Sequence, residues 1–511
     1  MKALQITVIA ILAIIIAVAV TYCCYDNGDD YDADGYLYAL YTDKEGNMNV
    51  VDVYESHIEE GRPTALAQRY RTSDSAGGIN EFWSFDRTTG KGPFNTFYAA
   101  INLMDDGPAY DNDDATEKRR STSVGSIAYV LDPYDLGRTL AGHAFTSDLY
   151  NIMLMIPTAY WVADTVTADR TEGNLVEGTE YNVLYISSSP SYSPCGHDAI
   201  GGMVAFAHSA STVSGKIDFR TNVYPYLGLG VYESYATTAD DPVGSGKLVS
   251  QSGKVPTAKL DVDGFKALAD SLVPASGNGP RSDYQQWNYY QWTLYKIMCD
   301  TVMGSMNSQA MVGDGYTKGN DSSAVTGSTD TVGLYGIAEM TRSASGEVSS
   351  ENGRTAAKLF IENGWGSLNI FLGDSFVMGS SPDTLFLYAG NYLGGEKLLE
   401  SRNQPSASQS LANIFVSGDP HRVIAGTSVN SATWSTPILA DANADAYADL
   451  RYPGDIVNAL KSGVASITVG GRWNNIHYSG VSFACAGYDI ATANDYRGAR
   501  LAYLLSEEHV L

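Results

Sequence analysis

The chain is poor in cysteine and in basic residues, and its charged residues of either sign are few. Its 511 residues include five cysteines, and none of them forms a CxxC pair or a Cys/His cluster at metal-ligand spacing. Neither a zinc site nor a disulfide framework is therefore indicated. Charged residues make up 18% of the chain, and 58 Asp and Glu against 32 Lys and Arg give a formal net charge of -26. Such a charge repels phosphate backbones and argues against nucleic acid as a partner.

Conventional catalytic signatures are also missing. The sequence contains no GxSxG, HExxH or GxGxxG motif, and its seven histidines are scattered singly. The stretch GSGKLVS at 244–250 offers Lys247, but Leu248 stands where a phosphate-binding loop needs a hydroxyl. We therefore predict no catalytic residues, no metal site and no cofactor, and we expect the protein not to be an enzyme.

The sequence is rich in apolar residues, glycine and tyrosine. Hydrophobic residues make up 44% of the chain, which is enough to bury sizeable cores and excludes wholesale disorder. The 51 glycines and 35 tyrosines combine turn formers with amphipathic rings. This mixture favours an exported, β-rich protein.

An apolar run, ALQITVIAILAIIIAVAVTY, occupies residues 3–22 and is preceded by Lys2. As a helix it matches a bilayer core of about 30 Å, so residues 1–25 are predicted to form a transmembrane anchor with a cytoplasmic N-terminus and the bulk of the chain outside. A cleaved signal peptide, lipidation at Cys23 or Cys24 and a processed pilin-type leader remain alternatives. Residues 26–35, DNGDDYDADG, then form an acidic spacer.

The rest of the chain divides by pattern. Alternating short runs predict a small β-rich domain over 36–118, and a polar linker is predicted near 108–123. A further β-rich region is predicted over 119–215. It is either a separate region or part of the module that follows it. Residues 216–511 mix amphipathic helical segments at 262–272 and 282–303 with long Gly/Ser/Thr loops and late strands. This pattern predicts an α+β module whose long loops form a binding surface.

Two polar sites allow more than one interpretation. The run DANADAYAD at 441–449 spaces Asp and Asn as calcium ligands would be spaced, but Ala446 replaces the glycine that makes the sharp bend. A solvated acidic loop is the preferred interpretation, with calcium as the alternative. Asn320 begins an Asn-Asp-Ser sequon, whose glycosylation the sequence leaves open.

Four segments in fixed order carry the most specific signal. The first, YPYLGLGVYESY at 224–235, holds a Gly-x-Tyr-Glu pattern, and the second, around 282–298, holds a tryptophan and a tyrosine on a helix. The third is KLFIENGWGSLNIFLGD at 358–374, and the fourth runs from ITVGGRWNN to DYRGARLAYLL. The matching residues are Gly230, Tyr232, Glu233, Trp287, Tyr290, Glu362, Asn363, Trp365, Gly366, Leu368, Gly470, Gly471, Trp473, Asn474, Gly498, Arg500 and Leu501.

Together these segments resemble the C-type-lectin-like fold of the formylglycine-generating-enzyme (sulfatase-modifying-factor) superfamily. The resemblance is strongest to the variable proteins of diversity-generating retroelements and to phage-tail and surface adhesins, and it covers about the last 290 residues. It implies a C-type-lectin-like ligand-binding module over 216–511. The chain departs from the pattern at Asn369 and Phe371, where the family has tryptophans.

The same resemblance offers an oxidase alternative, since the oxidising members bind copper through two cysteines separated by four residues. Cys485 matches the second cysteine, but the first position falls on Gly480. One thiolate cannot replace a pair that binds a soft metal. Apolar neighbours on both sides of Cys485 favour a buried structural thiol.

Residues 474–496 are predicted to form the binding face. The segment combines rings of few rotors with adaptable hydrogen-bonding groups, as antibody paratopes do. It contains no Met, Gln, Lys or Glu, as expected if adenines in Asn-type codons had been randomised. The candidate ligand-binding residues are Asn474, Asn475, His477, Tyr478, Ser479, Ser482, Tyr488, Asp489, Thr492, Asn494, Asp495 and Tyr496. A solvated loop without a ligand is the alternative.

The predicted function is thus that of a membrane-anchored extracellular adhesin or receptor, with a lectin-like and diversified binding face. Its partner would be a protein or glycan at a cell or virus surface. A structural subunit of a cell envelope or filament is the alternative, and an active formylglycine-type oxidase is less favoured because the second thiol is missing.

Overall fold

A computed structural model provides the structure of the chain. It describes residues 35–43, 48–52, 79, 83–104, 124–144, 147–168, 171, 175–189, 205–206, 212–213, 216–217, 223–272, 283–319, 322–340, 343–346, 348–351, 353–381, 384–389, 422–427, 437–440, 456–459, 463–476 and 479–505. The predicted anchor at 3–22, the predicted linker near 108–123, the acidic run at 441–449 and Asn320 lie outside the described residues.

The fold is mainly β, and the predicted α+β class is wrong. Strands make up 40% of the structure and helices 13%. The described residues contain three α-helices: α4 (Val262–Asp270), α5 (Tyr289–Met303) and α6 (Ser308–Met311). Both expected helical segments do form, as α4 and α5, but they are minor parts of a fold dominated by sheets. Short 3-10 turns occupy Pro93–Asn95 and Ser147–Leu149.

The predicted membrane localisation is also corrected. Within the described part of the chain, no helix is long and apolar enough to cross a membrane. This finding conflicts with the predicted single-pass membrane protein, and that prediction is withdrawn.

One seven-stranded sheet joins regions that the sequence had separated. Its order is β14-β26-β11-β6-β3-β4-β5. The strands are β3 (Phe97–Asn102), β4 (Ile127–Asp132), β5 (Asp135–Thr139), β6 (Tyr150–Pro157), β11 (Tyr226–Gly230), β14 (Tyr284–Gln286) and β26 (Leu501–Leu505). Because β6 pairs with β3 on one side and with β11 on the other, packing is continuous across both residue 119 and residue 216.

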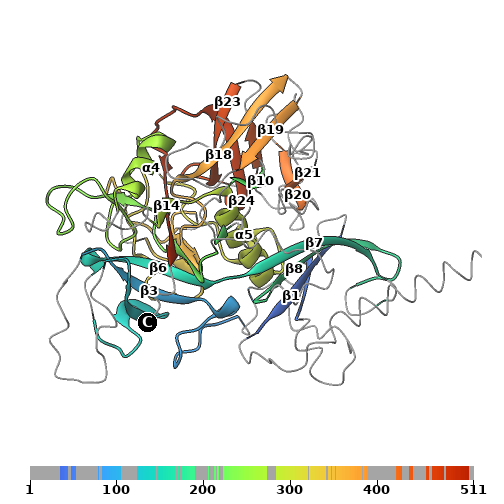
Figure 1. Cartoon of the computed structure of the whole chain (residues 1–511), viewed down its shortest axis with the longest axis horizontal. Helices are drawn as coiled ribbons and strands as arrows, with labels where there is room; N and C mark the ends of the chain where they lie inside the picture. Colours follow the sequence, from blue (N-terminus) through green and yellow to red (C-terminus); the bar gives the residue numbers. More distant parts are fainter. Residues whose placement is uncertain are drawn as a thin grey trace, which may run out of the picture.

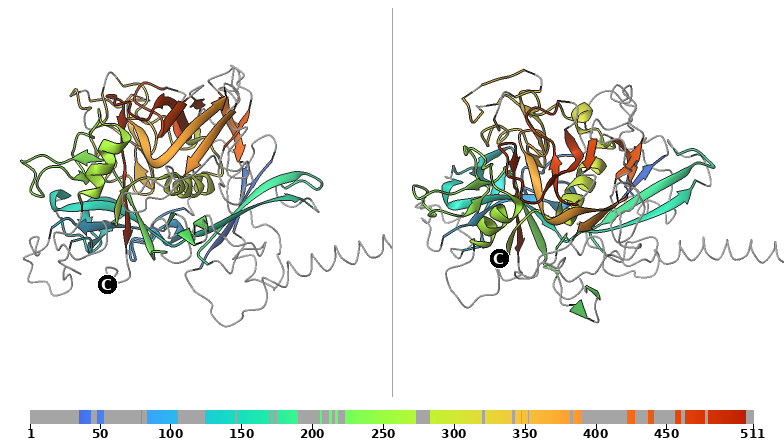
Figure 2. Two further views of the ribbon diagram at one scale, coloured as in Figure 1. Left: turned by 45° about the horizontal axis from the view of Figure 1, so that its top comes forward. Right: turned by 90° about the horizontal axis from the view of Figure 1, so that it is seen from above.

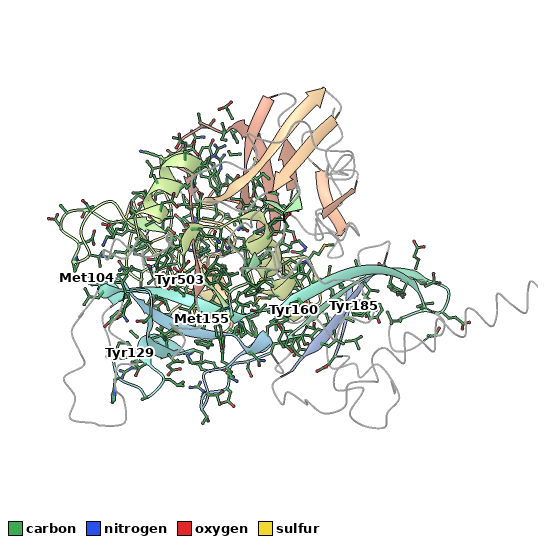
Figure 3. The ribbon with its side chains drawn as sticks, in the orientation of Figure 1. Met104, Tyr129, Met155, Tyr160, Tyr185 and Tyr503 are labelled. Carbon is green, nitrogen blue, oxygen red and sulfur yellow. The ribbon has the colours of Figure 1, made fainter. Side chains whose placement is uncertain are left out.

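A four-stranded sheet extends from this one, with the order β2-β1-β8-β7. Its strands are β1 (Leu37–Thr42), β2 (Met48–Asp52), β7 (Tyr160–Thr167) and β8 (Glu180–Ser187). Only Thr158 and Ala159 separate β6 from β7, so the two strands form one long ribbon that runs from one sheet into the other (Figure 1). Figure 3 shows Met155 and Tyr503 in the seven-stranded sheet, while Tyr160 and Tyr185 lie in the four-stranded one.

The second large sheet has eight strands in the order β19-β18-β23-β24-β22-β20-β21, with β25 beside β18. They are β18 (Asn369–Ser381), β19 (Thr384–Ala389), β20 (Arg422–Thr427), β21 (Pro437–Ala440), β22 (Ile456–Ala459), β23 (Gly463–Gly470), β24 (Gly480–Asp489) and β25 (Arg497–Gly498). Smaller pairings involve β9 (Thr212–Val213), β10 (Lys216–Ile217), β12 (Tyr235–Ala236), β13 (Leu248–Val249), β15 (Tyr335–Ala338), β16 (Ala356–Leu359) and β17 (Ile361–Glu362).

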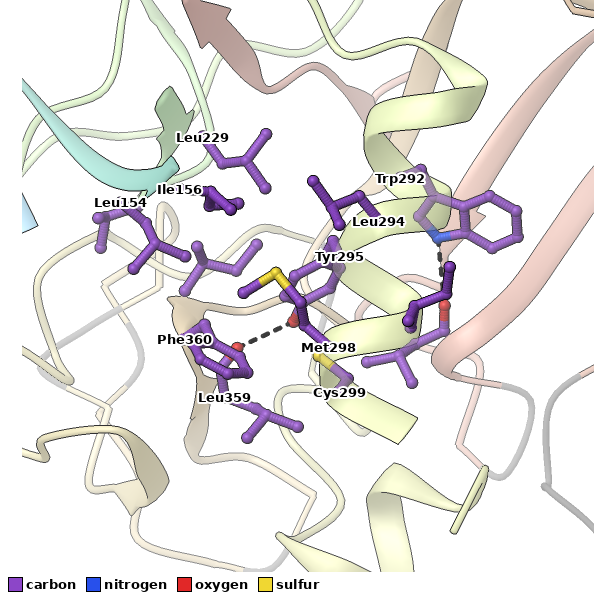
Figure 4. Close-up of a cluster of buried hydrophobic side chains, with 14 of the residues drawn as sticks. Leu154, Ile156, Leu229, Trp292, Leu294, Tyr295, Met298, Cys299, Leu359 and Phe360 are labelled. Atoms are coloured by element: carbon purple, nitrogen blue, oxygen red, sulfur yellow. Dashed lines mark hydrogen bonds between the residues drawn. The ribbon is translucent and has the colours of Figure 1, made fainter. Parts of the chain in front are cut away.

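Helix α5 lies between the two large sheets (Figures 1 and 2). It begins with a capping box, in which Asn288 and Gln291 exchange side-chain and backbone hydrogen bonds, and ends at Gly304 in the left-handed conformation. Fourteen of its fifteen residues are buried, so it is not the amphipathic helix expected from its sequence. Figure 4 shows Leu294 and Met298 facing aliphatic side chains of β6 and β11. On the opposite side of the helix, the Trp292 indole N–H donates a hydrogen bond to the Val481 carbonyl of β24 at 3.1 Å.

Candidate ligand-binding site

The four sequence segments meet around the buried guanidinium of Arg500. Its Nη1 donates to the carbonyls of Gly230 and Val231, at 3.1 and 3.0 Å, in the first segment. Its Nη2 donates to the carbonyls of Glu362 and Asn363 in the third segment, the latter at 2.7 Å. Arg500 itself belongs to the fourth segment and is 0% exposed. One side chain thus fixes three stretches that lie far apart in the sequence.

The second segment and a buried carboxylate complete this junction. The Trp287 ring lies 5.6 Å from the Arg500 guanidinium carbon. The Glu233 carboxylate accepts hydrogen bonds from the Ser367 hydroxyl at 2.6 Å and from the Leu368 amide at 2.9 Å. Burial raises the pKa of Glu233 to about 7, although Arg500 and these hydrogen bonds act in the opposite direction. The junction therefore holds a buried carboxyl whose charge is costly.

Two glycines lead from β23 into the candidate site. Gly470 and Gly471 have φ angles of 84° and 77°, a region that residues with a side chain rarely adopt. A Cβ on Gly471 would lie 2.3 Å from the Ser479 hydroxyl. The amide of Trp473 donates to the Ser367 carbonyl at 3.0 Å, and its ring is 8% exposed. The glycine pair thus permits a close backbone approach, and Trp473 is a buried anchor beside it.

Two loops come together next to this anchor. The guanidinium carbon of Arg472 lies 3.7 Å from the centre of the Tyr496 ring. Arg472 Nε donates to Asn475 Oδ1 at 3.0 Å, and the Asn494 amide donates to the Tyr496 hydroxyl. The backbone of Tyr496 is fixed in turn, because its carbonyl accepts from the Asn369 amide of β18 at 2.9 Å. We call residues 472–476 and 488–496 together the binding edge.

A second arginine supports the binding edge from behind. The Arg497 guanidinium carbon lies 4.0 Å from the Tyr488 ring centre, and the rings of Tyr488 and Tyr496 lie 6.2 Å apart. A hydrogen bond to Tyr496 and then burial raise the pKa of Tyr488. Burial lowers the pKa of Arg497, which is 1% exposed. Its Nη1 donates to the Thr492 carbonyl at 3.1 Å. Arg497 therefore holds the two rings in place.

The predicted binding residues divide into three groups. Ser479 and Ser482 are buried and point away from solvent, whereas His477 and Tyr478 lie outside the described residues. The others lie on the binding edge, exposed or half-buried: Asn474, Asn475, Tyr488, Asp489, Thr492, Asn494, Asp495 and Tyr496.

Sequence reasoning missed three residues of this site: Arg472, Ile476 and Arg497. The two arginines flank the predicted segment immediately, so a cation at each end of a polar, aromatic segment was the available signal. Ile476 lies inside the predicted segment but is not among the predicted binding residues.

The thiol of Cys485 is buried, as predicted, and lies in β24. Gly480, at the position of the first cysteine in the oxidising members, pairs with Gly470 at the other end of the strand. In the described part of the chain, no three His, Cys, Asp or Glu side chains are grouped so that they could hold a metal ion. A single thiol, with a glycine at the position of the other cysteine, does not fit the copper site that the resemblance implies.

The chain matches no protein-family model, and no curated protein matches it either. The resemblance to the formylglycine-generating-enzyme superfamily therefore stays a prediction from four motifs. The structure adds that these motifs meet around Arg500 and that this junction leads directly into the binding edge.

Proposed function

We propose that the chain is a ligand-binding protein whose binding face is the edge formed by residues 472–476 and 488–496. The observation that carries this proposal is the stacking of Arg472 on Tyr496, which joins two loops into one polar, aromatic surface. Asn474, Asp489 and Asp495 are exposed on it. Such residues supply adaptable hydrogen bonds beside rigid rings.

The binding edge is preorganised by the buried junction beneath it. The glycine pair, Trp473 and Arg497 are all buried, and each fixes the start or the end of a loop. A surface that is already ordered loses little conformational entropy when it binds, so more of the contact energy remains as affinity. This rigidity supports a recognition role over that of a merely solvated loop.

Ile476 offers further support. Its side chain is 43% exposed and its φ is 53°, a strained conformation for a β-branched residue. The backbone is held there by two hydrogen bonds: the Ile476 amide donates to the Thr317 carbonyl at 3.1 Å, and Gln309 donates to the Ile476 carbonyl at 2.7 Å. Strain of this kind clusters at functional sites. An exposed apolar side chain held in this way is suited to contact a partner.

The ligand would be a protein or a glycan, and arrays of both test the proposal. The full chain is compared with a variant carrying Asn474→Ala, Asp489→Ala and Asp495→Ala. A matched control carries Ser84→Ala, Glu177→Ala and Asp240→Ala, which also removes two carboxylates and one polar group from exposed positions. We expect the edge variant to lose its signals and the control to keep them. Equal signals from both variants would place binding outside the edge, whereas no signal from the full chain would favour the structural-subunit alternative.

A further inference from the structure

Arg472 is held in one orientation while part of its guanidinium stays available. One face lies on the Tyr496 ring, and Nε is engaged by Asn475. Among the described residues, Nη1 and Nη2 have no hydrogen-bond partner, and no carboxylate forms an ion pair with Arg472. The side chain is half-buried, so these two nitrogens are a pair of hydrogen-bond donors in a fixed orientation.

Among the described residues, Arg472 forms no ion pair although the chain is strongly acidic, and Arg87, which lies over the Tyr134 ring, forms none either. Two other described arginines pair with carboxylates: Arg138 with Asp135 at 3.0 Å and Arg354 with Glu351 at 3.8 Å. Arg497 adds a second charge behind the rings and, within the described part of the chain, has no ion pair either. Its buried Nε has no hydrogen-bond partner. Both cations thus contact one aromatic cluster, and neither forms an ion pair with a carboxylate of the described residues.

We propose that Arg472 binds the carboxylate of an acidic glycan, with Arg497 contributing positive charge from behind the tyrosine rings. This inference rests on the proposed function and specifies its ligand. A guanidinium presents parallel N–H donors that match the two oxygens of a carboxylate. Because Tyr496 and Asn475 already fix Arg472, forming this contact immobilises few further rotors.

The surroundings favour a glycan over a densely charged chain. The exposed amide of Asn474 is suited to sugar hydroxyls, and the exposed carboxylates of Asp489 and Asp495 can accept hydrogen bonds from such hydroxyls. The same two carboxylates, together with a net charge of -26, repel ligands with closely spaced negative charges. A single carboxylate among neutral hydroxyls satisfies both conditions.

The test uses calorimetry with oligosaccharides of known structure that carry one carboxylate each: a galacturonate-containing disaccharide, a glucuronate-containing disaccharide and a sialylated trisaccharide, each beside its carboxyl-reduced form. The full chain is compared with Arg472→Gln and Arg472→Lys, and with Arg138→Gln as an exposed arginine control. We expect at least one acidic sugar to bind. We also expect a loss of affinity of about tenfold or more for Arg472→Gln, a smaller loss for Arg472→Lys, and no change for Arg138→Gln.

Several outcomes would overturn the inference. These are equal affinity for an acidic sugar and its carboxyl-reduced form, no binding of any acidic sugar, or binding of polyglutamate in preference to the sugars. The proposed function fails separately, since it depends on the array signals of the triple edge variant. If those signals are lost while the carboxylate has no effect, the edge binds a ligand that Arg472 does not select by charge.

Discussion

Arg500 and Arg472 lie 28 positions apart and have opposite surroundings. Arg500 is fully buried, and its two terminal nitrogens donate to four backbone carbonyls. Arg472 is half-buried, and its one polar contact among the described residues is made by Nε to the Asn475 side chain. The terminal nitrogens of Arg500 donate their hydrogen bonds within the chain, whereas those of Arg472 can donate to another molecule.

This difference shows how one side chain serves two purposes within a single motif. Arg500 closes a junction between distant segments, where every acceptor needs a donor because water is excluded. Arg472 lies at the end of a rigid support that this junction provides. The comparison predicts that changes at the junction cost stability, whereas changes at the edge cost binding alone.

The largest effect is expected from Arg500→Met. It removes one donor from each of four buried carbonyls, and it removes the cation whose charge favours the ionised form of Glu233. We expect the free energy of unfolding to fall by about 3–5 kcal/mol, measured by urea unfolding followed by tryptophan fluorescence. Arg138→Gln, at an exposed site, should cost less than about 1 kcal/mol. A loss below about 1 kcal/mol at Arg500 would contradict its role as the centre of the junction.

Gly471→Ala is expected to have the next largest effect. The added Cβ would lie 2.3 Å from the Ser479 hydroxyl and 2.8 Å from the Ser479 Cα, on a backbone with φ of 77°. Gly142→Ala is the matched control, because Gly142 has φ of 93° and nothing within 4 Å of its Cβ position. The control should cost about 1–2 kcal/mol for conformation alone, and Gly471→Ala should cost at least as much again. Equal thermal midpoints for the two variants would show that the loop around Ser479 can shift to accommodate the added Cβ at little cost in stability.

A smaller effect concerns pH. Burial raises the pKa values of Glu233 and Glu362 from 4.5 to about 7. Between these values the folded state binds more protons than the unfolded state, so stability is highest at low pH and falls as the pH rises through about 7. Taken singly, each carboxyl contributes on the order of 3 kcal/mol to this fall. Burial lowers the pKa of Lys358 to about 8. Its titration makes stability rise with pH, but only at pH values above those at which the two carboxyls titrate.

Urea midpoints measured from about pH 5 to 7.5 test this expectation. Glu233→Gln should flatten the decline, whereas Glu177→Gln, at an exposed carboxyl, should leave it unchanged. If Glu233→Gln changes stability by the same amount at every pH, its carboxyl is already ionised throughout the range and the assigned pKa direction is wrong.

Parts of this fold were accessible from sequence, and the reason lies in local pattern. The alternating runs that became β4, β6, β7 and β8 were recognisable as strands, and α4 lies within its predicted range. The burial of α5 was not predicted, because it depends on two sheets assembled from strands hundreds of residues apart. The pairing of β6 with β11 likewise crosses a boundary that composition alone had suggested.

The binding edge shows the same limit. Its polar and aromatic composition was visible between residues 474 and 496, but the inward orientation of Ser479 and Ser482 follows from their place on either side of the start of β24. Arg472 was missed because its importance comes from contact with Tyr496, 24 positions away, which the turn after β23 and the strand β25 bring within reach.

The smallest effect on stability is expected at Arg472. A half-exposed cation over an aromatic ring contributes about 0.5–1 kcal/mol, so Arg472→Gln should lower the free energy of unfolding by less than about 1 kcal/mol. Measured beside Arg500→Met under the same urea conditions, it gives the contrast between the two arginines directly. If Arg472→Gln destabilises the fold as much as Arg500→Met does, Arg472 has a structural role, and its terminal nitrogens are not available to bind a ligand. If stability is kept while acidic sugars no longer bind, Arg472 acts at the surface that the junction supports.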